Sequence, residues 1–167
     1  MLDARPFGFR EYIRSNGFHT VYLLTTVQGS PVKIGISEDP VRRIGTIQSS
    51  HYEDLRFHRF WWLPGVAVAT RIEAAFKQNN VAENIRGEWF DMTPGEAERK
   101  IEAEIQKLGV WTLTQSQMEH LFDQWMRKKW GLPEHAQSPL SGRAPRKDEP
   151  WERSADNCQR AYPRKVS

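Results

Sequence analysis

Two neighbouring segments have patterns of apolar and polar residues that are typical of strands, and together they predict a β-hairpin near the start of the chain. Residues 20–27 are rich in β-branched and aromatic residues, and residues 32–37 alternate apolar with small or polar ones. Gln28-Gly29-Ser30-Pro31 between them is a typical turn sequence. Successive side chains of a strand point to opposite faces, so the apolar positions of the second strand are expected to face a core. They are Val32, Ile34 and Ile36.

The rest of the chain up to residue 130 is mostly helical in pattern. Apolar residues recur with helical spacing in four segments, and two more segments are typical of strands. The predicted helices are residues 40–49, 66–79, 94–109 and 114–130, and the predicted strands are residues 55–63 and 88–92. Asp39, Thr93 and Thr114 are the expected N-cap residues, with Glu96 and Gln117 completing two capping boxes.

The order of these elements predicts the fold class and the domain organisation. A hairpin makes the first two strands antiparallel, so we expect a small α/β (α+β) domain with a mostly antiparallel sheet flanked by helices. No glycine-rich phosphate loop is present. We divide the chain into an extension at 1–18 with one short helix, a domain at 19–109, a C-terminal helix at 110–132 and a tail at 133–167. The tail is rich in Pro, Ser and charged residues, a composition that predicts disorder.

Charge and cysteine content narrow the function classes only slightly. Basic and acidic residues balance over residues 1–142, so the formal net charge of +3 arises from the last 25 residues. The positive charge is therefore weak evidence for nucleic-acid binding by the folded part. The single cysteine, Cys158, rules out an intramolecular disulfide and a cysteine-based zinc site. No apolar run approaches the roughly 20 residues of a membrane span and no secretion signal is evident, so we expect a cytoplasmic protein.

An ordered set of short motifs resembles the GIY-YIG nuclease superfamily over roughly residues 19–92. Val21-Tyr22 stands where the family has Ile-Tyr, and Lys33-Ile34-Gly35 stands where it has Tyr-Ile-Gly. Arg43 matches the family arginine, and Glu73 matches its metal-binding glutamate. The combination with Gly87-Glu88-Trp89-Phe90 is most similar to a phage- and bacteria-associated branch of this superfamily.

The resemblance implies metal-dependent hydrolysis of a DNA phosphodiester bond. Glu73 would hold one Mg²⁺ or Mn²⁺ ion, and Tyr22 would accept a proton from the attacking water. A free phenol titrates near ~10, so Lys33 and Arg43 are expected to lower the pKa of Tyr22 and to contact the phosphate. RNA or a nucleotide is a further possible substrate.

Two departures from the family pattern keep a second hypothesis open. Lys33 replaces the second family tyrosine, and the late family asparagine has no single counterpart, since Asn80 and Asn84 both lie nearby. The alternative is a catalytically inactive nucleic-acid-binding or protein-interaction module on the same fold. Glu88 is interpreted as a turn or strand-edge partner rather than as a site residue.

Further contacts with DNA are predicted from clustered cations. The candidates are Arg42, Arg43, Lys77, Lys128 and Lys129. The last two follow an apolar helical stripe that we also consider a possible surface for homo-oligomers.

Aromatic and histidine residues are given structural interpretations. The tryptophans of the predicted strands, Trp61, Trp62 and Trp89, are expected in the core rather than as platforms for nucleobases. His51 and His58 lack partners at metal-ligand spacing and are interpreted as structural or exposed.

Overall fold

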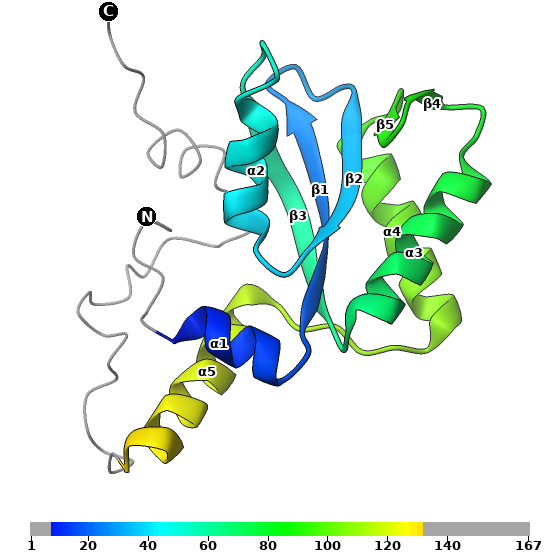
Figure 1. Ribbon diagram of the computed structural model, residues 1–167. Helices are drawn as coiled ribbons and strands as arrows, with labels where there is room; N and C mark the ends of the chain where they lie inside the picture. The colour runs from blue at the N-terminus through cyan, green and yellow to red at the C-terminus, as the bar shows by residue number, and fades with distance from the viewer. Residues whose placement is uncertain (1–7, 132–167) are drawn as a thin grey trace, which may run out of the picture.

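The computed structural model describes residues 8–131 as one sheet with helices on both faces (Figure 1). Residues 1–7 and 132–167, including the predicted tail and Cys158, lie outside the described residues. The strands are β1 (His19–Thr26), β2 (Val32–Ser37), β3 (Leu55–Leu63), β4 (Asn84–Arg86) and β5 (Trp89–Phe90). The helices are α1 (Phe9–Ser15), α2 (Pro40–Gln48), α3 (Val66–Asn79), α4 (Pro94–Leu108) and α5 (Gln115–Trp130). The predicted α+β class with a small antiparallel sheet is confirmed.

The five strands form a sheet in the order β3-β1-β2-β5-β4, and every pairing is antiparallel. The predicted hairpin is present as β1 and β2, and β1 is the central partner of β2 and β3. The predicted strand at 88–92 is shorter than expected, because pairing with β2 involves only Trp89 and Phe90. The sequence pattern missed β4, whose three residues are all exposed and therefore carry no alternating apolar signal.

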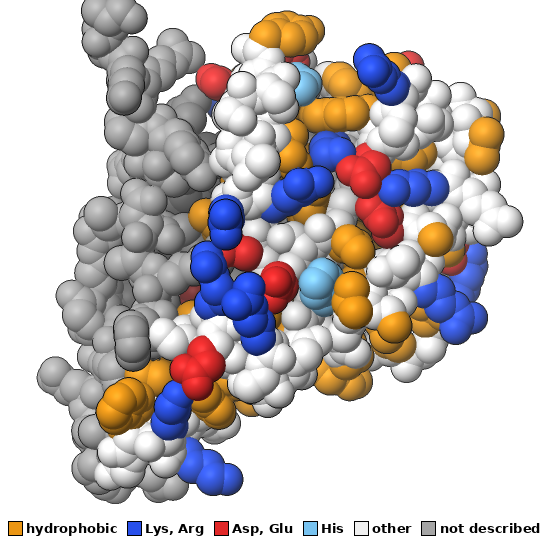
Figure 2. All heavy atoms as spheres, viewed as in Figure 1, with side chains coloured by type: hydrophobic (Ala, Val, Ile, Leu, Met, Phe, Trp, Pro, Cys, Tyr) orange, Lys and Arg blue, Asp and Glu red, His pale blue; other side chains and the backbone are white. Residues whose placement is uncertain are grey.

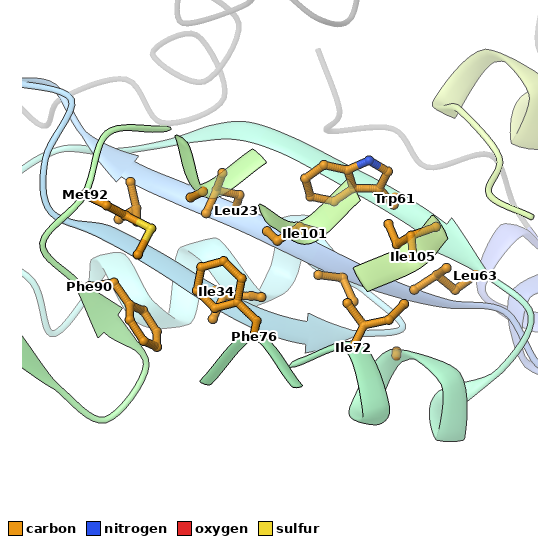
Figure 3. Packing of buried hydrophobic residues seen from close by; sticks show 14 residues of the cluster. Leu23, Ile34, Trp61, Leu63, Ile72, Phe76, Phe90, Met92, Ile101 and Ile105 are labelled. Atoms are coloured by element: carbon orange, nitrogen blue, oxygen red, sulfur yellow. The ribbon is translucent and has the colours of Figure 1, made fainter. Parts of the chain in front are cut away.

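The main core lies between one face of the sheet and the helices α3 and α4. Val32 and Ile34 are fully buried in it, as the alternation predicts, and Ile36 packs at its margin. Figure 3 shows Ile72 and Phe76 of α3 and Ile101 and Ile105 of α4 packing over these strands; all four side chains belong to this cluster. Burying one face of a sheet and one stripe of each helix is the physical basis of this layered arrangement.

The opposite face of the sheet is covered by α2. Here Tyr22 and Leu24 of β1 pack with Ile44 of α2 and Leu55 of β3. Asp39 caps α2 by accepting a hydrogen bond from the Arg42 backbone N–H at 2.9 Å, as predicted. Lys33 also projects to this face and is buried. Lysines are rarely buried unless they are paired with an acidic group.

The capping predictions for the last two helices differ in outcome. Thr114 and Gln117 form the complete predicted box at α5. At α4 only half of the box forms: Thr93 accepts from the Glu96 backbone N–H, while the Glu96 carboxylate pairs with Lys100 at 3.0 Å. An ion pair one turn along the helix has therefore replaced the second hydrogen bond of the box.

The helices α1 and α5 pack together against β3 and form a separate aromatic cluster. Phe9 and Tyr12 of α1 surround Phe122 of α5, with ring centroids 5.1 and 5.5 Å away, and Trp62 of β3 completes the cluster. The apolar stripe of α5 thus packs within its own chain, and oligomerisation through it stays a prediction. Within residues 8–131, no helix is both long and apolar enough to cross a bilayer.

We predict that Phe122→Ala lowers the free energy of unfolding by roughly 3–5 kcal/mol, because it empties the centre of the α1–α5 cluster. Urea denaturation followed by circular dichroism measures this change. His120→Ala, on the exposed face of the same helix, is the control and should change the value by less than about 0.5 kcal/mol. Equal effects of the two substitutions would show that α5 does not pack as described.

Candidate active site

Tyr22 is positioned by a glycine directly across the hairpin. Tyr22 of β1 is the register partner of Gly35 of β2, and the tyrosine ring lies over the glycine. A Cβ atom at position 35 would come closer than 3.0 Å to the hydroxyl oxygen and Cζ of Tyr22. Only 1% of Tyr22 is exposed, and Phe57 contacts its ring edge-on at 6.3 Å. The Lys-Ile-Gly motif therefore supplies the space in which the phenol lies.

Arg43 of α2 is the hydrogen-bond partner of this phenol. Its Nε donates to the Tyr22 hydroxyl over 3.4 Å, a long hydrogen bond. Burial raises the pKa of Tyr22, and the hydrogen bond and charge of Arg43 oppose this effect without overcoming it. Arg43 therefore lowers the pKa of Tyr22, as expected, and no effect of Lys33 is found. The net pKa is still raised in the protein alone, because the cost of desolvating a phenolate is larger.

Lys33 lies on the same face as Tyr22 and forms an ion pair with Glu88, a residue whose sequence context did not indicate a place in the site. Its ammonium group binds Glu88 in the turn between β4 and β5 and lies over the Trp89 ring, 5.7 Å from the centroid. The Ile34 backbone N–H also donates to the Glu88 carbonyl at 3.1 Å, which fixes the turn against β2. Glu88 is a turn residue, as interpreted, but its carboxylate belongs to the candidate site.

Glu73 joins this group from α3 through a lysine one turn further along the helix. The Lys77 ammonium lies 3.2 Å from Glu73 Oε1 and 3.3 Å from Glu88 Oε1, so it bridges the two carboxylates. Burial raises the pKa of Glu73, and the neighbouring Glu88 adds to this while Lys77 opposes it. For Glu88 burial acts in the same direction, but Lys33 and Lys77 outweigh it and lower its pKa.

These six side chains form one electrostatic unit, which we call the charged cluster. Its members are Tyr22, Lys33, Arg43, Glu73, Lys77 and Glu88. The two carboxylates influence the titration of both the phenol and the guanidinium, which places all of them within electrostatic range. In Figure 2 acidic side chains gather between lysine and arginine side chains near the β5 end of the sheet. The structure therefore brings together all four side chains predicted to carry the chemistry.

Glu73 and Glu88 are the side chains in the cluster that could hold a divalent cation. Within residues 8–131, no three His, Cys, Asp or Glu side chains converge to form a metal site on their own. Mg²⁺ needs fewer protein ligands, since it commonly binds one or two carboxylates together with waters and substrate phosphates. The donor set fits such an ion, with Lys77 supplying the positive charge between the carboxylates in the protein alone.

The two candidate asparagines have structural roles. Asn80 is buried, and its side chain donates to the Phe76 carbonyl at 2.7 Å near the end of α3. Asn84 donates to the carbonyls of Gly87 and Trp89, at 3.0 and 3.3 Å, and so braces the turn that carries Glu88. Asn84 is therefore the one that supports the charged cluster.

The other predicted DNA contacts lie in two places. Arg42 is exposed on α2 next to Arg43, whereas Lys128 and Lys129 lie at the end of α5, away from the β4–β5 turn (Figure 1). Lys129 binds Glu11 at 2.6 Å and covers the Trp125 ring, which joins α5 to α1. The role of these cations in DNA binding stays a prediction.

Comparison with known proteins identifies the segment that contains the charged cluster. A family model described as the T5orf172 domain matches residues 19–108, from the first residue of β1 to the last of α4. No curated protein and no solved structure matches the chain. All six residues of the charged cluster lie inside the matched segment, and α1 and α5 lie outside it.

We predict that Gly35→Ala destabilises the protein by roughly 1–3 kcal/mol, because the added methyl group forces the Tyr22 ring out of its place. Gly95→Ala is the matched control: nothing lies within 4 Å of the added atom, and alanine favours the helix there. Thermal unfolding of both variants and of Gly35→Ala combined with Tyr22→Ala measures the coupling. A cost of Gly35→Ala that persists undiminished without the ring would contradict the proposed contact.

Proposed function

Because the chain belongs to the T5orf172 domain family, a phage-associated domain of the GIY-YIG and homing-endonuclease-like class, we propose that it is a metal-dependent DNA endonuclease of the GIY-YIG type. The main support is the convergence of a phenol, a guanidinium, a buried ammonium and two carboxylates from separate elements on one charged cluster. Structural ion pairs alone do not require a tyrosine hydroxyl and an arginine in the same group.

In the proposed reaction, Glu73 would hold one Mg²⁺ or Mn²⁺ ion, with Glu88 nearby as a second carboxylate. The bound cation would neutralise negative charge on the scissile phosphate and on the leaving oxygen. Lys77 would have to move away from Glu73 for a cation to bind there, and its long side chain, which is 34% exposed, allows this. The raised pKa of Glu73 indicates a carboxylate that is incompletely compensated by its protein partners, which supports binding of a cation there.

The remaining groups would act on water and on phosphate. Tyr22, as the phenolate, would accept a proton from the attacking water and become a neutral phenol. The Arg43 guanidinium would stabilise the phenolate before this transfer and contact a phosphate oxygen. Lys33, where the family has a second tyrosine, is held by Glu88 and contributes positive charge beside the phosphate. The hydroxyl that is lost by this replacement is thus exchanged for an ammonium group.

A second candidate function is a catalytically inactive module that binds nucleic acid or protein. One observation favours it: in the protein alone the two lysines are paired with the two carboxylates, and burial keeps Tyr22 protonated. Such a module would bind DNA in a salt-dependent way and would cleave nothing with any divalent cation.

We predict that the protein nicks or cuts plasmid DNA only when Mg²⁺ or Mn²⁺ is present, and that Glu73→Gln reduces the rate roughly 100-fold or more. The amide is isosteric but carries no charge to hold a cation. Conversion of supercoiled plasmid, with and without a chelator, measures the rate.

Glu119→Gln on the exposed face of α5 is the control for this assay and should cleave like the unmodified protein. Full activity of Glu73→Gln would overturn the metal assignment. DNA binding without cleavage under every condition would establish the inactive module instead.

The pKa of Tyr22 leads to a prediction on pH dependence. A group whose pKa is raised above 10 is mostly protonated at neutral pH, so the active phenolate increases as pH rises. The cleavage rate should therefore increase by about tenfold per pH unit at and just above neutral pH. Tyr22→Phe should be slower by roughly 100-fold or more and should lose this dependence. An unchanged pH profile in Tyr22→Phe would show that hydroxide, not Tyr22, accounts for the slope.

A further inference from the structure

Three aromatic rings extend outward from the charged cluster, and we call them the aromatic ladder. The first is Trp89, whose ring is contacted by the Lys33 ammonium at 5.7 Å. His51 stacks on Trp89 with a centroid separation of 5.0 Å and an angle of 25°. Tyr52 stacks on His51 at 5.4 Å and 7°. The ladder therefore connects a lysine that binds Glu88 to a ring at the surface of the protein.

The outer ring of the ladder is open to solvent. Tyr52 is 93% exposed, more than any other large hydrophobic residue in the described part of the chain. One face of its ring is turned to His51, and no ring contact is found for the other face among residues 8–131. A single exposed tyrosine needs no explanation. A tyrosine that ends a stack leading to a charged cluster requires one. Trp89, which the sequence predicts to lie in the core, is only half-buried and packs at the margin of the cluster around Tyr22.

The loop that carries Tyr52 is held in shape by hydrogen bonds from one side chain. Gln48 donates to the carbonyls of His51 and Glu53, at 3.3 and 2.8 Å, and accepts from the Leu55 backbone N–H at 2.7 Å. The His51 ring is fixed in turn by the Glu53 backbone N–H at 3.3 Å. Because these hydrogen bonds already hold the loop in place, its aromatic rings need not become ordered when a ligand binds. This lowers the entropic cost of binding.

The charges around Tyr52 select the kind of group that can bind there. Glu53 follows directly in the chain, and its carboxylate raises the pKa of the Tyr52 phenol. The Glu53 carboxylate next to the ring repels a phosphate, so the sugar–phosphate backbone does not fit at the outer end of the ladder. A neutral planar ring does fit. Nucleobases are such rings, and they stack on exposed aromatic side chains with little dependence on base identity.

We propose that Tyr52 stacks an unpaired nucleobase of the DNA strand that the charged cluster acts on; this inference rests on the nuclease function proposed above. Phosphate would bind beside Lys33 and Arg43, and a neighbouring base, unstacked from its own strand, would extend the ladder beyond Tyr52. Fully paired duplex offers no free base face. The protein should therefore prefer DNA with unpaired bases next to the cleaved bond, such as single strands, bulges or flaps.

Binding of fluorescein-labelled oligodeoxynucleotides tests this proposal without relying on cleavage. Fluorescence anisotropy is measured with the Glu73→Gln variant in the presence of a chelator, for a single strand, a bulged duplex and a fully paired duplex. Adding Tyr52→Ala should weaken binding of the first two by roughly 5- to 100-fold and leave the paired duplex nearly unchanged. Tyr52→Phe should bind like the parent, because the stacking ring is kept.

Two controls separate stacking from general effects. Trp111→Ala removes another exposed aromatic ring, outside the ladder, and should not change the affinity. Replacing the bulged nucleotide by an abasic site should abolish the difference between the parent and Tyr52→Ala.

The proposal is overturned if Tyr52→Ala binds bulged DNA like the parent, or if it loses affinity equally for paired DNA. It is also overturned if the parent binds none of the three probes. Metal-dependent plasmid cleavage by the unmodified protein would leave the nuclease function standing in each of these cases, and its absence would remove both.

Discussion

The contact between Tyr22 and Gly35 is the constraint on which the site depends. A tyrosine on a strand between two neighbours is ordinarily enclosed by their side chains. Here the neighbour has no side chain, so the ring lies flat on the β2 backbone and its hydroxyl reaches Arg43 at the edge of α2. The same register directs Lys33 to the Tyr22 face and sends Val32 and Ile34 into the core below. Because successive side chains of β2 point to opposite faces of the sheet, the same strand contributes to the main core and to the charged cluster.

Charge neutralisation explains how polar groups are tolerated at this depth. Lys33 is 8% exposed, and a buried ammonium without a partner would be costly or would lose its proton. Glu88, in the β4–β5 turn, offsets this cost by forming an ion pair with Lys33. Asn84 of β4 holds the turn in place through a hydrogen bond to the Gly87 carbonyl. β4 and β5 are short, but the turn between them carries the carboxylate on which the buried lysine depends. The position of β5 next to β2 therefore follows from electrostatics as much as from strand pairing.

The sequence predicts the elements and the four residues of the proposed chemistry, because both leave strong local patterns. β-branched and aromatic residues reveal β1, alternation reveals β2 and helical spacing reveals α2 to α5. Tyr22, Lys33, Arg43 and Glu73 stand in motifs at familiar spacing. The pattern misses β4 because its exposed residues carry no periodicity. It misses the importance of Glu88 because pairing with Lys33 bridges 55 positions of the chain. The Gly-Glu-Trp-Phe motif was the available signal. The lowering effect of Arg43 on the pKa of Tyr22 is predicted from the sequence, but the larger opposing effect of burial is not, because burial cannot be judged from spacing.

The same charge balance bears on how such a protein would hold DNA. The residues up to 142 carry no net charge, and the lysines of the cluster are already paired with carboxylates. Long-range attraction to phosphate is therefore weak. Affinity must come from short-range exchange, in which a phosphate takes the place of a carboxylate on Lys77. An exchange of one anionic partner for another releases few counterions, so affinity should depend on salt less steeply than in a protein with an open basic surface. Uncharged contacts would then contribute a larger share of the binding free energy, and an exposed ring at the edge of the charged cluster is a group of that kind.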